Sequence, residues 1–163
     1  MNTEWQAICD NPLFRDAPFK VETNRWGKIV MSPASNKHGL FQILIAEWLL
    51  KLAPDGRPIA ECSIETADGV KVANVAWASN DFLRRHGVVN PYPEAPEILV
   101  EILLPSNTLA EMEEKKELYF ARGAREVWLC EEHGAMRFYN NHARLESSAL
   151  ALNFPARVEL PFT

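Results

Sequence analysis

A single glutamate, Glu101, interrupts an otherwise wholly apolar run at residues 98–104. The run is rich in branched residues and stops at Pro105, which is typical of a buried strand rather than a helix. Because side chains alternate along a strand, Glu101 should share a face with Leu99 and Leu103. An ionised carboxylate taken out of water must be paired or bound to metal, or else become protonated. We therefore expect the partner that neutralises the Glu101 carboxylate to mark the functional site.

Length and composition indicate one soluble domain with a single core: 163 residues, of which 47% are hydrophobic and 24% charged. We expect one domain over residues 1–163, with residues 1–17 as an N-terminal extension. No apolar stretch has the length of a membrane span and no secretory signal is visible, so we expect a cytoplasmic protein with reduced thiols at Cys9, Cys62 and Cys130. The net charge of −5 argues against a large non-specific nucleic-acid surface, although acidic metal ligands add negative charge that a bound cation reverses locally.

Hydrophobic periodicity predicts a mixed sheet with few helices. Ser35 or Asn36 should cap the first long helix, while Thr108 and Glu111 fit a capping box at the start of the second. The predicted elements, in chain order, are a hairpin with strands at 20–23 and 28–31, a helix at 37–52, a hairpin with strands at 59–67 and 70–78, a short helix and loop within 81–96, the Glu101 strand at 98–104, a helix at 109–122, and strands at 126–130, 136–139 and 157–160.

The second hairpin carries the dipeptide Asp68-Gly69, the strongest short-range signal for a two-residue type I′ turn. Such a turn pairs Ala67 with Val70, and it therefore pairs Ser63 with Asn74. One face is then apolar, and a slip of one residue would mix the faces, which supports this register. The apolar face holds Ala60, Cys62, Ile64, Ala73, Val75 and Trp77, and the opposite face holds Glu61, Ser63, Glu65, Val72, Asn74 and Ala76.

The helix at 109–122 can supply a cation to Glu101. Lys116 lies nearly on the apolar stripe of this helix, three residues before Tyr119, and Lys115 lies at the edge of the stripe. Helix period alone does not decide which of the two lysines reaches Glu101, although the position of Lys116 nearer the apolar stripe favours Lys116. Either lysine is a natural ion-pair partner for a buried glutamate on the preceding strand.

Carboxylates from two adjacent strands and a nearby lysine are the groups that phosphodiester hydrolysis needs. The acids hold Mg²⁺ through oxygen ligands, the metal activates water and stabilises the phosphate, and the lysine offsets developing charge. His38 and Gln42, four apart on one helix face, can line such a site, or His38 can be bonded locally at the helix start. The simpler alternative for Glu101 is a structural ion pair.

Several motifs together resemble the Uma-type family of putative restriction endonucleases, which belongs to the PD-(D/E)XK nuclease superfamily. The similarity extends from the first hairpin to Tyr139 and implies an α/β fold with a restriction endonuclease-like core, a mixed β-sheet flanked by α-helices, with β-hairpins. The motifs that carry it lie at residues 22–27, 32–35, 38, 71–77, 96–106, 115–119 and 123–128.

The resemblance implies a role for each matched residue. Glu101 would be the acid of the (D/E)XK strand, and the lysine of that motif, replaced by Leu103 here, would lie in the next helix at Lys115. The hairpin acid falls on Asn74, which can ligate Mg²⁺ through its carbonyl oxygen but brings no charge, so affinity for the ion should fall.

The implied activity is Mg²⁺- or Mn²⁺-dependent endonucleolytic hydrolysis of DNA. Because one small site reaches one strand, cleavage of a duplex would suggest a homodimer. The alternatives are a binding module that has lost catalysis and a purely structural subunit. The implied catalytic residues are Glu101, Lys115 and Asn74, the metal ligands are Glu101, Asn74 and Glu61, and possible accessory residues are His38, Gln42, Glu65 and Lys116.

Overall fold

The computed structural model describes residues 3–15 and 19–162. Six strands form one mixed sheet in the order β3-β4-β5-β6-β7-β8. Strands β5 and β6 are parallel and joined by helix α5, while the other neighbouring strands are antiparallel. The strands of this sheet are β3 (Gly56–Thr66), β4 (Gly69–Ser79), β5 (Ile98–Ile102), β6 (Glu126–Cys130), β7 (Met136–Tyr139) and β8 (Arg144–Leu145).

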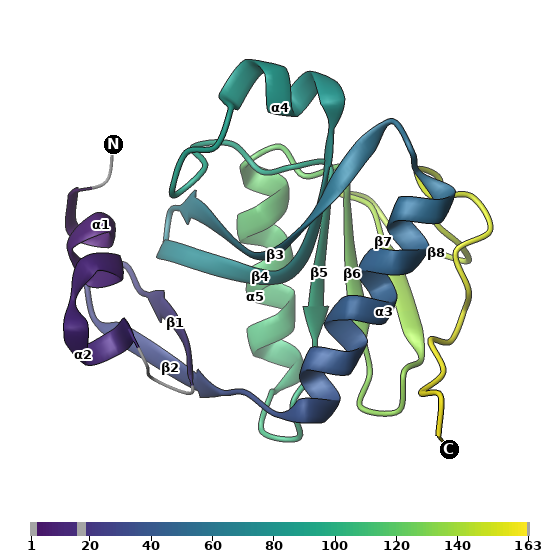
Figure 1. Cartoon of the computed structure of the whole chain (residues 1–163), viewed down its shortest axis with the longest axis horizontal. Helices are drawn as coiled ribbons and strands as arrows, with labels where there is room; N and C mark the ends of the chain where they lie inside the picture. The colour runs from purple at the N-terminus through teal and green to yellow at the C-terminus, as the bar shows by residue number, and fades with distance from the viewer. Residues whose placement is uncertain (1–2, 16–18, 163) are drawn as a thin grey trace.

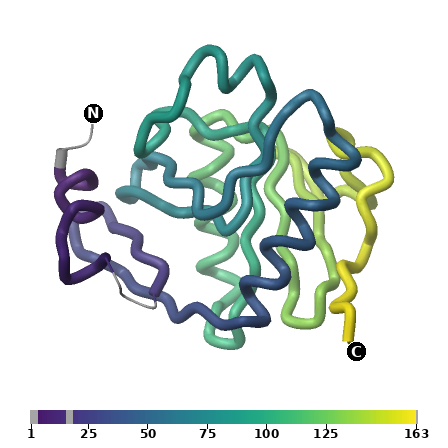
Figure 2. The backbone as a smooth tube through the Cα atoms, in the orientation of Figure 1, coloured from purple at the N-terminus to yellow at the C-terminus, as the bar shows by residue number. Residues whose placement is uncertain are grey.

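Helices cover both faces of this sheet, which confirms the predicted α/β architecture. Helix α3 (Asn36–Leu52) crosses the front face in Figure 1, and α5 (Leu109–Ala121) lies behind the strands. The short helix α4 (Asn80–His86) stands at one end of the sheet. In Figure 2 the C-terminal segment runs along the side of the molecule opposite the N-terminal helices. No helix in the described part of the chain is long and apolar enough to cross a membrane.

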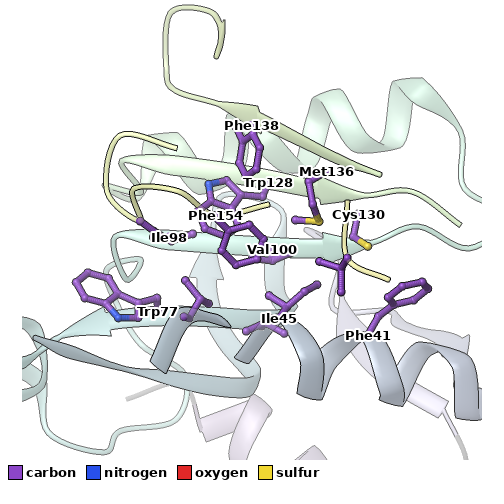
Figure 3. Packing of buried hydrophobic residues seen from close by; sticks show 14 of the residues in the cluster. Phe41, Ile45, Trp77, Ile98, Val100, Trp128, Cys130, Met136, Phe138 and Phe154 are labelled. Atoms are coloured by element: carbon purple, nitrogen blue, oxygen red, sulfur yellow. The ribbon is translucent and has the colours of Figure 1, made fainter. Parts of the chain in front are cut away.

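The two faces of the sheet bury separate apolar clusters. Ile98, Val100 and Ile102 pack toward α3, whereas Leu99 packs with Tyr119 of α5. This alternation confirms the predicted faces of the Glu101 strand. Figure 3 shows Ile45 of α3 directed at Val100 and the other side chains of the first cluster.

A separate two-stranded sheet precedes α3 and lies beside the main sheet. It consists of β1 (Phe19–Thr23) and β2 (Ile29–Pro33), and it follows the short helices α1 (Thr3–Asp10) and α2 (Pro12–Arg15). Two β1 side chains tie the hairpin to β4. The Glu22 carboxylate accepts the Val72 N–H at 2.8 Å, and the Thr23 hydroxyl accepts the Val70 N–H at 2.8 Å. These bonds bring Lys20 and Glu22 toward the end of β5.

The predicted register of the β3–β4 hairpin is wrong. Thr66 pairs with Gly69 and Ser63 with Val72, so Ala67 and Asp68 form the turn. The Thr66 hydroxyl donates to the Gly69 carbonyl and accepts the Asp68 N–H, which stabilises this turn instead of the type I′ turn.

The observed register has a consequence for the site. Asn74 now lies opposite Glu61, between the Ala60–Val75 and Cys62–Ala73 pairs, instead of opposite Ser63. Glu61 also has a left-handed backbone, with φ of 52°. The strict alternation of faces breaks here, because Ala73 packs on the α5 side while Val75 packs on the α3 side.

One further prediction differs from the structure. The strand predicted at 157–160 is absent, since within this described segment only Arg157 forms a bridge, to Ala135. Instead, the short strand β8 pairs with β7, a feature too brief to give a periodic signal. The predicted capping box of α5 is confirmed: the Thr108 hydroxyl accepts the Glu111 N–H, and the Glu111 carboxylate accepts the Thr108 N–H.

Candidate functional site

A cavity of about 360 Å³ opens at the C-terminal end of β5. Its walls come from β1, the start of α3, the β3–β4 hairpin, β5 and α5. Hence elements distant in the sequence meet around one strand end. The polar and charged side chains that line the cavity include Lys20, His38, Gln42, Glu61, Asn74, Glu101 and Lys115.

Glu101 is only 3% exposed, yet cationic groups reach both of its carboxylate oxygens. The Lys115 ammonium lies 3.2 Å from Oε1, and the Lys20 ammonium lies 3.1 Å from Oε2. The Tyr119 hydroxyl donates to Oε1 at 2.6 Å. The buried acid is therefore neutralised by two lysines instead of the single lysine expected from the sequence.

These contacts keep Glu101 ionised. Burial is the largest single influence and raises the pKa, but Lys115, Lys20 and the Tyr119 hydroxyl outweigh it and hold the pKa at about 2. Burial likewise lowers the pKa of Lys115, but the carboxylates of Glu101 and Glu22 raise it above its ordinary value. Both members of the pair are charged at neutral pH.

The structure distinguishes the two candidate lysines of α5. Lys115 contacts Glu101 and also lies 3.0 Å from the Glu22 carboxylate. Lys116 is turned away from the cavity: its ammonium pairs with Glu113 at 2.8 Å and lies 3.6 Å from the centre of the Tyr139 ring. Lys116 is buried, so the helix period correctly marked it as inward-facing, but its ammonium lies against β7 and not against Glu101.

Asn74 is 1% exposed and connects β5 with α3. Its Oδ1 accepts the Ile102 N–H at 2.9 Å, so its Nδ2 is the atom that lies 2.8 Å from His38 Nε2. Because Nδ2 can only donate, His38 Nε2 must accept, and the imidazole proton is on Nδ1. Burial, followed by the charge of Lys20, lowers the pKa of His38, which keeps this imidazole neutral.

Glu61 sits at the mouth of the cavity and is hydrogen-bonded to Gln42. The Gln42 side-chain amide donates to the Glu61 carboxylate and to the main-chain carbonyl of Asn74. Desolvation raises the pKa of Glu61 above its ordinary value, although the Gln42 hydrogen bond and the charge of Lys20 act to lower it. The helix face that carries His38 and Gln42 therefore does line the cavity.

The structure does not bring Glu65 to the cavity. Glu65 pairs with Val70 near the hairpin turn and lines a different hollow, next to Trp5 and Thr23. It lies four residues beyond Glu61 on a strand, a distance of about 13 Å at the rise of an extended chain. Sharing a predicted face with Asn74 was therefore not enough to place Glu65 at the site.

Sequence reasoning missed three residues that contact the charged pair: Lys20, Glu22 and Tyr119. Two weak signals pointed to them. Lys20 and Glu22 are two apart on a predicted strand and so share a face. Tyr119 lies four residues after Lys115, on the same side of the helix. Neither signal shows that the first hairpin packs against the end of β5.

The oxygen atoms around the cavity are of the kind that Mg²⁺ and Mn²⁺ prefer, with carboxylates from Glu101 and Glu61 and an amide oxygen from Asn74. Among residues 3–15 and 19–162, no three His, Cys, Asp or Glu side chains are grouped closely enough to hold a metal ion. Both Glu101 oxygens already receive donors, and Asn74 Oδ1 receives the Ile102 N–H. The donor chemistry fits a hard cation, with water required to complete its coordination.

Comparison with solved structures bears on the fold. The crystal structure of a putative nuclease of DUF820 from Anabaena variabilis matches with a TM-score of 0.69 and 16% identity, covering 85% of this chain and 87% of that chain. This likeness confirms the restriction endonuclease-like fold. The DrdV–DNA complex, known from cryo-electron microscopy, covers 65% of this chain and 9% of its own, with 15% identity and a TM-score of 0.44 that is too low to carry an argument. No curated protein matches the sequence.

The family assignment rests on the sequence itself. Residues 10–160 match the Uma2 family, which is described as a putative restriction endonuclease. This range contains Glu101, Asn74, Lys115 and the first hairpin. The chain therefore belongs to the Uma2 family.

Proposed function

We propose that this chain hydrolyses phosphodiester bonds of DNA with Mg²⁺ or Mn²⁺ at the cavity beside β5. The observation that carries the proposal is a buried, ionised glutamate paired with a lysine of the following helix at a cavity wall. Family membership supports a nuclease of this general kind. A structural ion pair alone would not require the additional oxygen donors of Asn74 and Glu61 in the same cavity.

Each residue has a distinct part in this proposal. Glu101, Asn74 and Glu61 would hold the ion, which when bound supplies an activated water and a positive charge for the scissile phosphate. Lys115 offsets negative charge that develops on the phosphate. Neutral His38 orients the Asn74 amide, and Gln42 orients Glu61. The substrate is a DNA strand, and a second copy of the chain would supply the site for the other strand.

A second candidate function is that of a nuclease-fold module that binds but does not cleave. The specific observation in its favour is Asn74, because an amide at the position of the hairpin acid removes one negative charge from the cavity. Both oxygens of Glu101 are also held by ammonium groups. In this second function the cavity and its lysines would bind a ligand, but no catalytic ion would be held there.

A plasmid-nicking assay in Mn²⁺ tests both functions. We expect slow nicking by the wild-type chain and an increase of about tenfold in Asn74→Asp, since a carboxylate binds the ion more strongly than an amide. Lys115→Ala should lower the rate by about a hundredfold, whereas Lys116→Ala, whose side chain faces away from the cavity, is the matched control with little change.

Two outcomes would change the conclusion. Nicking only by Asn74→Asp would identify a disabled enzyme and favour the binding module. Absence of nicking in every variant, including Asn74→Asp, would end the hydrolase proposal.

A further inference from the structure

Lys20 stands out among the cavity residues because nothing in the proposed reaction requires it. It belongs to β1, in the separate two-stranded sheet, and its ammonium lies 3.1 Å from Glu101 Oε2. The Lys20 side chain is only 11% exposed. A long charged side chain is seldom buried unless its charge is used, so this contact calls for an explanation.

The two oxygens of Glu101 have different surroundings. Oε1 receives Lys115 and the Tyr119 hydroxyl, and Tyr119 is fully buried, so this oxygen faces the protein interior. Oε2 receives the Lys20 ammonium. Lys20 and Lys115 both line the cavity, but Oε1 is also held by the buried Tyr119 hydroxyl. Oε2 is therefore the oxygen that a ligand in the cavity reaches by displacing a single ammonium group, and Lys20 already occupies it.

We propose that Lys20 is a resident counter-ion of the cavity, and that a divalent cation binds Glu101 only by displacing the Lys20 ammonium. The inference rests on the proposed function, because it concerns the ion that hydrolysis would use. Once displaced, the ammonium has a flexible four-carbon stem and a second carboxylate, Glu61, on the same cavity wall. It then becomes available to an incoming phosphate group.

The charges around the cavity explain why this matters for affinity. The carboxylates of Glu22, Glu61 and Glu101 face the ammonium groups of Lys20 and Lys115, which leaves a net charge of −1. A nearly neutral cavity attracts a dication weakly. Removing the Lys20 charge and adding a carboxylate at Asn74 each make the cavity more negative by one charge. The two changes should therefore strengthen cation binding to a similar extent.

Calorimetric titration of Mn²⁺ into the full chain tests this inference without relying on catalysis. We expect Lys20→Met, which keeps the stem and removes the charge, to tighten Mn²⁺ binding at least about tenfold. Lys20→Arg keeps the charge and should stay within about twofold of wild type. The control is Lys28→Met, which removes an exposed lysine from the loop of the same hairpin and should also leave the affinity unchanged.

A second measurement needs no substitution at Lys20 and so does not depend on the folding of that variant. In the wild type and in Asn74→Asp, saturating Mn²⁺ should increase the acetylation rate of Lys20 several-fold, as measured by peptide mass spectrometry, while Lys28 stays unchanged. A folded Lys20→Met with wild-type or weaker affinity would overturn the inference, and so would Lys20 reactivity that does not respond to Mn²⁺.

These results separate the inference from the proposed function. Tighter Mn²⁺ binding in Lys20→Met, with no variant able to nick DNA, would support the counter-ion role and end the hydrolase proposal. Mn²⁺-dependent nicking of DNA, with a Mn²⁺ affinity that Lys20→Met leaves unchanged, would support the hydrolase proposal and overturn the counter-ion role.

Discussion

Glu101 remains charged inside the protein because two other elements supply three donors to its carboxylate. Lys20 comes from β1, whereas Lys115 and Tyr119 come from α5, and the acid itself is on β5. Breaking such a pair by removing one member is costly, since the other charge is left buried. The same arrangement ties the stability of the fold to the protonation of one residue.

This linkage predicts a loss of stability in acid. The pKa of folded Glu101 is about 2 and its ordinary value is 4.5, so its contribution is complete above about pH 4.5 and disappears as pH falls toward 2. Tyr119→Phe removes the hydroxyl but keeps the ring. It should lower the free energy of unfolding by about 1.5–3 kcal/mol at pH 7, the range for a hydrogen bond to a charged group.

Urea unfolding at several pH values checks this prediction. The difference between wild type and Tyr119→Phe should shrink as Glu101 becomes protonated in both proteins. A difference that stays constant down to pH 2 would mean that the hydroxyl acts through something other than the charge of Glu101.

At the scale of elements, the two hairpins meet at a glycine. Gly69 follows the β3–β4 turn with φ of 80°, and a Cβ built there would lie 2.7 Å from the backbone carbonyl oxygens of Thr23 and Asn24. Asp68 in the same turn accepts from Arg25 at 2.9 Å and from Lys71 at 2.8 Å. The turn therefore fixes the position of the hairpin that carries Lys20 and Glu22.

Gly69→Ala should consequently destabilise more than an ordinary glycine substitution. Gly27, with φ of 71° and no atom within 4 Å of a built Cβ, is the matched control. Gly27→Ala pays only for its left-handed backbone, about 1 kcal/mol, whereas Gly69→Ala also displaces backbone and should cost at least about 2 kcal/mol. Chemical denaturation measures both values, and equal losses would show that the contact between the hairpins relaxes freely.

At the scale of the whole molecule, the C-terminal segment completes the core on the α3 face. Phe154 is buried, with its ring centre 4.6 Å from that of Trp128 and 6.1 Å from that of Phe138. Figure 3 shows these three rings together above the side chains of α3. This cluster lies on the opposite side of the sheet from Tyr119, so its stability can be changed separately from the charged pair.

Phe154→Ala should lower the free energy of unfolding by about 3–5 kcal/mol, because a large cavity is left in a packed core. Leu152→Ala, two residues away and 65% exposed, is the control and should change it by no more than about 0.5 kcal/mol. Mn²⁺ affinity measured in the folded state should be the same in both variants. A change in Mn²⁺ affinity confined to Phe154→Ala would show that the core cluster and the cavity are coupled.

The sequence alone determined the features that depend on local pattern. Strands β6 and β7 occupy the predicted residues, and the α5 capping box forms as its four-residue motif indicates. The faces of β5 follow from alternation, so the burial of Glu101 was predictable from its apolar neighbours. These properties rest on backbone geometry that repeats over two to four residues.

Only the tertiary structure decided which groups meet Glu101. Periodicity gives the side of an element on which a residue lies, but not its depth or the element packed against it, so Lys115 and Lys116 could not be separated by period. Lys20 reaches Glu101 across 81 positions of the sequence, through a hairpin held by side-chain bonds to β4. Such contacts depend on how the sheets pack together, because no local repeat in the chain specifies them.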